Sequence, residues 1–167
     1  MNNVIEWVDM VQQGGAVRRF HTLPTIGSET VAEHSFGVAM LCVALTNGQP
    51  TVHLLKAALF HDLAEQFTGD VPAPTKWKHP FLKTVLEGIE EDFEHNYELK
   101  VKLSPTDHLV FKWADMLQLL LFCKMQRDMG NRLMNPVFAR GVEYLGKLET
   151  HENGQKILNW IIENYGK

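Results

Sequence analysis

The sequence has no long apolar run and no excess of basic residues, and each of these absences argues against a class of protein. No apolar run approaches the roughly 20 residues that span a bilayer, and the first residues include no apolar core of a secretory signal. We therefore expect a cytoplasmic protein with no membrane partner. Lys and Arg number 16 against 20 Asp and Glu, which gives a formal net charge of −4. A long basic surface for nucleic acid is therefore not expected either.

Cysteine is also scarce. The chain has two, Cys42 and Cys123, each within an apolar helical pattern. This setting favours buried, reduced thiols over a disulfide, as is typical of cytosolic proteins. Hydrophobic residues make up 45% and charged residues 22% of the 167 residues, which is enough apolar material for the core of one domain.

Strand signals are nearly absent, and helical patterns fill the chain. The Asn47-Gly48 pair ends an apolar helix and is followed by Pro50, so it is not a hairpin turn. Two prolines within 68–74 deny a helix its amide donors, so a turn or loop is expected there. The expected helices cover 4–13, 30–45, 51–67, 80–99, 104–129, 136–149 and 152–164. The simplest fold that accounts for these helices is all-α, a single helical-bundle domain over 1–167.

Two of these helices begin with clear capping signals. Thr30 can act as an N-cap, and Glu33, three residues on, can complete a capping box. Ser104 is a favoured N-cap residue, and Pro105 follows at the first helical position, where its missing N–H costs nothing. These signals fix the starts of two helices that carry residues with metal-ligand chemistry.

Four residues of metal-ligand type are expected to face the core from three helices. His34 shares an apolar face with the residues four, seven, eight and eleven positions on, and His61 and Asp62 follow a second apolar stripe. Asp115 lies on the apolar face of the helix over 104–129. No Arg lies on these stripes, so the buried carboxylates need another cation, which a metal would supply. Open positions on that metal would admit water and a substrate oxygen, which points to metal-assisted hydrolysis. The alternative is that each residue is an ordinary core residue.

Several segments together resemble the HD-domain phosphohydrolases. They are Val31-Ala32-Glu33-His34-Ser35, His61-Asp62-Leu63-Ala64-Glu65, Thr68-Gly69-Asp70-Val71-Pro72-Ala73-Pro74 and Trp113-Ala114-Asp115. Their order and spacing over residues 14–125 are similar to the 5′-deoxynucleotidase branch and the related short viral dATP triphosphohydrolases. The resemblance implies an HD-domain helical bundle, with metal ligands at His34, His61, Asp62 and Asp115. It also implies a divalent transition metal (Zn, Co or Mn) and a homo-oligomer.

Two acidic residues are candidates for the chemistry. Glu65 lies four residues after His61 and three after Asp62, so its carboxylate should project over the same end of the helix. There it can hold the attacking water or accept its proton, the role that the resemblance also implies. Asp70 corresponds by resemblance to a residue beside the sugar and the reaction centre; a turn-capping Asp is the alternative.

Three basic residues are candidates for binding phosphate. Arg19 lies fifteen residues before His34, the spacing at which the resembled nucleotidases keep a phosphate-binding Arg. A guanidinium can grip phosphoryl oxygens in bidentate fashion. Lys112 lies one turn before Asp115 and shares its face, and Lys76 follows the double-proline segment, from which it could close over the same phosphate.

Two aromatic residues are candidates for contact with the nucleoside. Phe20 stands where the resembled nucleotidases tend to carry Trp, packed near C2′ of the sugar. Phe is smaller and has no indole donor, so a preference for 2′-deoxy sugars is expected but a strict one is not. Trp77 could line the base side of the pocket, or it could belong to the core or an interface.

The resulting functional prediction is a metal-dependent phosphohydrolase of 2′-deoxynucleoside 5′-phosphates. A triphosphate substrate, giving deoxynucleoside and triphosphate, is slightly favoured because the short chain and its Gly-Gly-Ala-Val-Arg-Arg-Phe-His-Thr segment look like the viral dATP-hydrolysing members. A 5′-deoxynucleotidase acting on monophosphates is the alternative. A non-catalytic nucleotide-binding helical protein and a phosphodiesterase are the rivals of other classes. The complete ligand set with Glu65 argues against the first, and the acidic net charge argues against the second.

Overall fold

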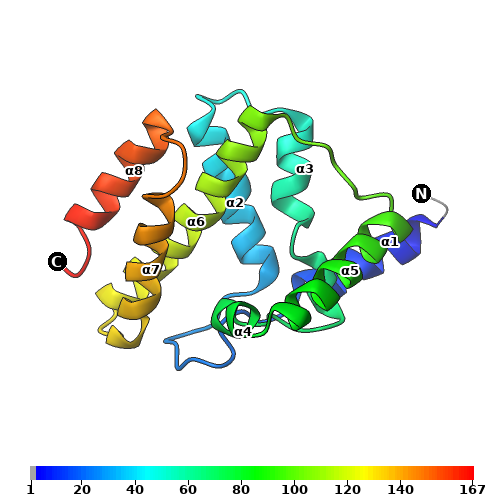
Figure 1. Cartoon of the computed structure of the whole chain (residues 1–167), viewed down its shortest axis with the longest axis horizontal. Helices are drawn as coiled ribbons and strands as arrows, with labels where there is room; N and C mark the ends of the chain where they lie inside the picture. Colours follow the sequence, from blue (N-terminus) through cyan, green and yellow to red (C-terminus); the bar gives the residue numbers. More distant parts are fainter. Residues whose placement is uncertain (1–2) are drawn as a thin grey trace.

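The computed structural model describes residues 3–167, apart from the side chain of Trp77. Over this range the chain forms eight α-helices and two short 3-10 helices, and no strand (Figure 1). The prediction of an all-α fold is confirmed. None of these helices is both long enough and apolar enough to cross a membrane. In chain order they are α1 (Val4–Gly15), α2 (Val31–Leu45), α3 (Val52–Phe60), η1 (Leu63–Gln66), α4 (Ala73–Lys78), α5 (Pro80–Asn96), α6 (Pro105–Asp128), η2 (Arg132–Met134), α7 (Asn135–Leu145) and α8 (Glu152–Glu163).

The predicted caps are present at the starts of α2 and α6. The Thr30 hydroxyl accepts from the Glu33 N–H at 3.3 Å, and the Glu33 carboxylate accepts from the Thr30 N–H at 2.7 Å. The Ser104 hydroxyl accepts from the Asp107 N–H at 3.1 Å. Each contact satisfies an amide that the first helical turn leaves without a partner, so local sequence alone sets where these helices begin.

Helices α2 and α6 lie in the middle of the molecule, with α7 and α8 on one side and α3, α1 and α5 on the other (Figure 1). Their facing sides form the main core, which includes Val38, Cys42, Trp113, Leu117 and Cys123. Both cysteines are buried and free, as expected. A smaller core, which includes Met10, Val31, Leu63 and Phe93, joins α1, η1 and α5. The two cores meet along α2, so the side chains at its first turns lie between them.

The predicted helix over 51–67 is wrong beyond Phe60. His61 is the C-cap of α3, and Asp62 has φ −104° and ψ 3°, outside the α-helical region; η1 follows. In a continuous helix adjacent side chains point about 100° apart, so a single metal could not easily reach both. The turn at 61–62 instead brings both side chains to one point.

The expected loop over 68–74 is also corrected. It extends only to Pro72, because α4 begins at Ala73 and contains Pro74 in its first turn. A first-turn amide has no intrahelical acceptor, so proline is tolerated there. Smaller differences occur at helix ends: α1 continues to Gly15, α5 stops at Asn96, and α7 covers Asn135–Leu145.

Candidate functional site

The structure brings together the four residues predicted as metal ligands. His34 comes from α2, His61 and Asp62 from the turn after α3, and Asp115 from α6. His34 Nε2 lies 3.2 Å from both His61 Nε2 and Asp115 Oδ1. Asp62 Oδ2 lies 3.4 Å from His61 Nε2 and 3.7 Å from His34 Nε2. Three of the four, His34, His61 and Asp115, form a group whose ligand atoms all lie within 4.8 Å of one another, and Asp62 is not part of that group.

The hydrogen bonds of the two imidazoles determine which nitrogen faces this centre without a proton. His61 Nδ1 lies 3.0 Å from the Ala58 carbonyl, which can only accept, so the proton is on Nδ1. His34 Nδ1 faces the amide oxygen of Gln118, so it too must donate. In its neutral form each ring therefore presents an unprotonated Nε2 to the other ring and to the two carboxylates.

Four acceptors at such distances repel one another unless a cation lies between them. Ligand atoms about 2.0–2.1 Å from a tetrahedral metal are separated from each other by about 3.3 Å. The two Nε2 atoms lie 3.2 Å apart, and each lies 3.2 to 4.0 Å from the carboxylate oxygens, at this value or somewhat above it. The donor set is thus chemically and geometrically suited to a divalent transition metal.

Asp115 is held in its anionic form. Burial favours the protonated acid, but the adjacent His34 imidazole and the nearby His61 and Arg19 hold the pKa of Asp115 well below its usual range. An anionic oxygen is therefore available at this point of α6 over the ordinary range of pH.

Arg19 is paired with one of these carboxylates, although no Arg lies on the apolar stripes of the three helices. Its Nη1 donates to Asp62 Oδ2 at 2.8 Å, and its Nε donates to Glu29 Oε2 at 3.1 Å. Arg19 comes from the loop between α1 and α2, so helix periodicity gave no sign of it. Burial opposes the charge of Arg19, but the surrounding carboxylates, led by Asp62 and Glu29, raise its pKa above the usual value.

One of the two predicted catalytic carboxylates lies within η1 and the other in the loop that follows it. Glu65 lies within η1, and its Oε2 is buried without a hydrogen-bond partner among the described residues. Burial, together with the charges of Asp62 and Asp70, raises the pKa of Glu65 to about 8. Asp70, in the loop that follows, accepts a hydrogen bond from the Phe20 N–H at 2.9 Å. An anionic Glu65 therefore needs a cation or a water close by.

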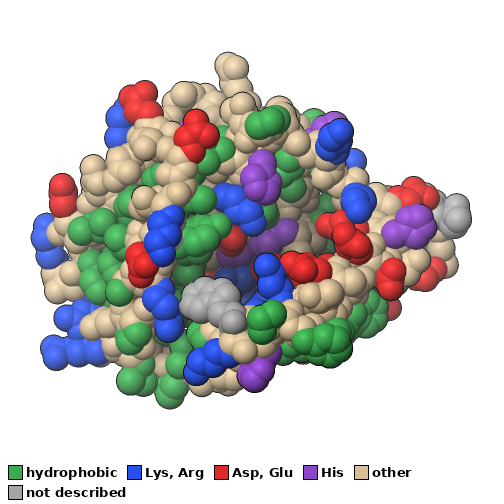
Figure 2. All heavy atoms as spheres, in the orientation of Figure 1, with side chains coloured by type: hydrophobic (Ala, Val, Ile, Leu, Met, Phe, Trp, Pro, Cys, Tyr) green, Lys and Arg blue, Asp and Glu red, His purple; other side chains and the backbone are tan. Residues whose placement is uncertain are grey.

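A cavity of about 610 Å³ adjoins the metal-ligand cluster. Arg19, Phe20 and Asp70 line it. Its other lining residues are Thr22, Leu23, Pro72, Ala73, Pro74, Thr75, Met116, Leu119, Val137, Arg140, Gly141 and Tyr144. Figure 2 shows histidine, acidic and basic side chains gathered in a hollow near the middle of one face. The cavity is mostly apolar, and Arg19, Asp70 and Arg140 are the charged residues of its lining, a combination that suits a phosphorylated, ring-bearing ligand.

The other predicted substrate-binding residues lie around this region. Lys76, in the last turn of α4, is half-buried and lowers the pKa of Glu65, so its charge acts at the same place. Lys112 is half-buried on α6, with Nζ 5.7 Å from the centroid of the Phe111 ring; that ring packs edge-on against His61. Neither lysine lines the cavity. The backbone of Trp77 belongs to α4, and its side chain lies outside the described atoms.

One wall of the cavity comes from α7, which contains no residue that the sequence selected. Arg140 and Tyr144, one helical turn apart, both line the cavity. At Gly141 a Cβ would lie only 2.8 Å from Leu120 Cδ2, so glycine allows α7 to approach α6 closely. In the sequence, the only sign of this wall is that Arg140 and Tyr144 lie four residues apart on an amphipathic helix. That spacing places both side chains on one face but does not show what the face contacts.

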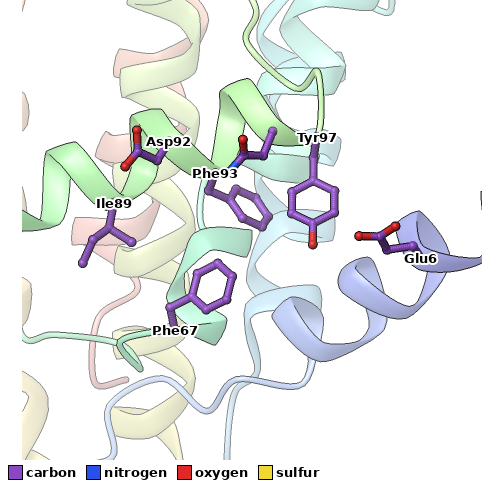
Figure 3. Close-up of a pocket in the computed structure, with 7 residues that line it drawn as sticks. Glu6, Phe67, Ile89, Asp92, Phe93 and Tyr97 are labelled. Atoms are coloured by element: carbon purple, nitrogen blue, oxygen red, sulfur yellow. The ribbon is translucent and has the colours of Figure 1, made fainter. Parts of the chain in front are cut away.

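A second cavity, of about 380 Å³, lies between α1 and α5 beside η1. Figure 3 shows the Phe67 and Phe93 rings, which pack edge to face with centroids 5.9 Å apart, and the Glu6 side chain of α1 extending toward Tyr97. None of the predicted site residues lines this cavity, so it is separate from the candidate site.

The helical fold and the clustered His and Asp residues are those of an HD phosphohydrolase. The chain belongs to the 5′-deoxynucleotidase YfbR-like family, which matches residues 6–106. It is 26% identical over 176 residues to a 5′-deoxynucleotidase of Photobacterium profundum, with 89% of this chain and 88% of that protein covered. It is 36% identical over 115 residues to the dATP triphosphohydrolase of Cyanophage S-2L, with 65% of each chain covered.

The solved structures give the same result. The Cyanophage S-2L HD phosphohydrolase DatZ, bound to dA and one catalytic Zn²⁺ ion, superposes with a TM-score of 0.69 at 27% identity. The alignment covers 93% of both chains. The resemblance to HD-domain deoxynucleotide hydrolases is thus confirmed by sequence and by structure.

Proposed function

We propose that this protein is a metal-dependent phosphohydrolase of 2′-deoxynucleoside 5′-phosphates, with a triphosphate as the favoured substrate. The observation that carries the proposal is the convergence of two unprotonated imidazole nitrogens and two carboxylates beside a largely apolar cavity. The relatives named 5′-deoxynucleotidase and dATP triphosphohydrolase support the substrate class. The Zn²⁺ ion in DatZ supports a divalent transition metal (Zn, Co or Mn).

In this proposal His34, His61, Asp62 and Asp115 hold the metal. When bound, such an ion supplies Lewis acidity to a phosphoryl oxygen and to water. Glu65 accepts a proton from the attacking water, whose oxygen forms the new bond to phosphorus while the bond from phosphorus to O5′ breaks. O5′ takes a proton from solvent water as it leaves, and Glu65 returns its own proton to solvent afterwards. Arg19, held by Asp62 and Glu29, faces the developing charge on the phosphoryl oxygens.

The same arrangement serves two substrates. Attack on a monophosphate gives deoxynucleoside and phosphate, and attack at the α-phosphorus of a triphosphate gives deoxynucleoside and triphosphate. Lys76 and Lys112 are further cations at this end of the site, which is a reason to favour the longer phosphate chain. We therefore expect Lys76→Ala and Lys112→Ala to raise the KM for a deoxynucleoside triphosphate more than that for the monophosphate.

The decisive experiment is a screen of deoxy and ribo mono- and triphosphates with added Zn²⁺, Co²⁺ or Mn²⁺, with products separated by chromatography. Deoxynucleoside and intact triphosphate from a dNTP would support the proposal as stated. Deoxynucleoside and phosphate from a dNMP alone would support the 5′-deoxynucleotidase alternative. No turnover of any nucleotide by protein that binds both metal and nucleotide would make it a non-catalytic binding protein.

The cytoplasmic location and the homo-oligomeric state stay predictions. Light scattering of the purified protein would test the second, and fractionation of cells that express it would test the first.

A further inference from the structure

Glu29 is a buried carboxylate that connects the His34 side of the candidate site with the Arg19 side. It is 6% exposed and lies just before the N-cap of α2. One of its oxygens, Oε1, accepts from Gln118 Nε2 at 2.7 Å. The other, Oε2, accepts from Arg19 Nε at 3.1 Å. Its backbone carbonyl also accepts from the Arg19 N–H at 2.8 Å, so the two residues are fixed to each other twice.

The contact with Glu29 decides which way the Gln118 amide points. A carboxylate only accepts hydrogen bonds, so the NH₂ group of Gln118 must face Glu29 and its oxygen must face His34 Nδ1. That oxygen holds the proton of His34 on Nδ1 and leaves Nε2 free to bind a metal. The reversed amide would place an NH₂ donor against His34 and favour the wrong tautomer.

The packing of α2 against α6 leaves room for Gln118 only because residue 37 is glycine. A Cβ at Gly37 would lie 2.8 Å from Gln118 Cγ. The atom concerned is near the base of the side chain, so the whole amide would have to shift. Backbone packing and the Glu29 hydrogen bond therefore both determine the position of Gln118.

We propose that Glu29 and Gln118 are positioning residues that hold His34 and Arg19 in one arrangement, so that metal binding and phosphate binding depend on the same buried carboxylate. The inference rests on the proposed function, because it assigns His34 to the metal and Arg19 to the phosphate. The chain of contacts runs from His34 through Gln118 and Glu29 to Arg19, which in turn donates to Asp62 Oδ2 at 2.8 Å. Both ends of this chain of contacts, His34 and Asp62, belong to the metal-ligand cluster.

The first test measures metal affinity, which does not depend on turnover. Zn²⁺ binding to metal-stripped protein is followed by competition with a chromophoric chelator, and the Co²⁺ form is followed by its visible absorption. Gln118→Leu should weaken Zn²⁺ binding by about 10–100-fold and change the Co²⁺ spectrum. Gly37→Ala keeps every polar group but displaces Gln118, so it should also weaken Zn²⁺ binding.

Gln126 provides a matched control on the same helix. It is a fully buried glutamine of α6 that bonds to the backbone of Ile26 and to Asn131, away from the metal-ligand cluster. Gln126→Leu should lower the melting temperature by an amount similar to Gln118→Leu while keeping the Zn²⁺ dissociation constant within about threefold. Equal loss of metal affinity in both variants would mean that any buried glutamine matters, and would overturn the inference.

The second test separates the two branches at Glu29. Glu29→Gln should weaken Zn²⁺ binding and also raise the nucleotide KM of the metal-saturated enzyme by about tenfold, because both partners lose an anionic acceptor. Gln118→Leu should raise that KM less than Glu29→Gln does, because Arg19 keeps its carboxylate partner at 3.1 Å. If the wild-type protein binds metal and hydrolyses nucleotides while Glu29→Gln changes neither quantity, the inference fails and the proposed function stands. If the wild-type protein binds no metal, both fail.

Discussion

The backbone N–H of Phe20 donates to Asp70 Oδ2 at 2.9 Å, which ties the loop before α2 to the loop after η1 at the rim of the cavity. Phe20 has φ +56°, a left-handed conformation that costs a non-glycine residue about 1 kcal/mol or more. Its ring stacks on Phe122 with centroids 4.7 Å apart and planes 2° apart. The hydrogen bond and the stacking together compensate for the strained backbone and fix the ring at the cavity wall.

The first prediction concerns the choice of sugar. If the Phe20 ring packs against C2′, a ribose hydroxyl there would lose its water without gaining a partner, at about 1–3 kcal/mol, or roughly tenfold to hundredfold in kcat/KM. Phe20→Ala should therefore lower activity on deoxynucleotides and raise relative activity on ribonucleotides. Leu23→Ala, at another apolar residue of the cavity, is the control. An unchanged deoxy-to-ribo ratio in Phe20→Ala would assign discrimination to Asp70 or to the segment around Pro72.

The second prediction concerns the metal. His61→Ala and Asp115→Ala each remove one of the four converging acceptors, so both variants should lose bound transition metal and hydrolysis together. Metal content by mass spectrometry and nucleotide turnover are the measurements. His53→Ala, at an exposed histidine in the first turn of α3, should keep both. Stoichiometric metal and full turnover in either ligand variant would show that the metal lies elsewhere.

The third prediction separates binding from chemistry at Glu65. Glu65→Gln keeps the size of the side chain and its hydrogen-bonding capacity but removes the proton acceptor. Metal and nucleotide should still bind, while kcat falls by about 10²-fold or more. Isothermal titration with nucleotide and single-turnover kinetics would measure the two effects separately. A near-normal kcat would transfer the role of base to Asp70 or to metal-activated water alone.

The fourth prediction is a pH dependence of stability in the metal-free protein. The pKa of Glu65 is raised from 4.5 to about 8 on folding, mainly by burial. The folded state therefore binds this proton more tightly than the unfolded state, and the resulting stabilisation is complete below about pH 4.5 and lost as pH rises through about 8. Glu65→Gln cannot lose that proton, so the variant should be more stable than the wild type at pH 9 but not at pH 5.

Thermal unfolding of chelator-treated protein at both pH values would measure this difference. For a protein of this size 1 kcal/mol corresponds to about 2–4 °C in Tm, so we expect a gap of several degrees at pH 9. Saturating Zn²⁺ should reduce the gap, because a nearby cation stabilises the Glu65 carboxylate. A gap of equal size at pH 5 and pH 9 would show that Glu65 does not titrate in this range.

Local sequence determined the helices that carry the site and the types of its ligands. The capping box at Thr30 and the Ser-Pro start of α6 place two helices without reference to the rest of the chain, because each satisfies its own first amides. The periodicity of apolar residues then turns His34 and Asp115 inward. These are properties of neighbouring residues, so they can be read directly from the sequence.

Only the tertiary structure decided how those groups are charged, oriented and connected. The break in the helix after Phe60, the approach of α7 to the cavity and the pairing of Arg19 with Asp62 all depend on residues distant in the chain. The Glu29–Gln118 hydrogen bond joins residues 89 positions apart. No local pattern encodes such a contact, because it forms only when burial leaves a carboxylate and an amide without water and each must take the other as its partner.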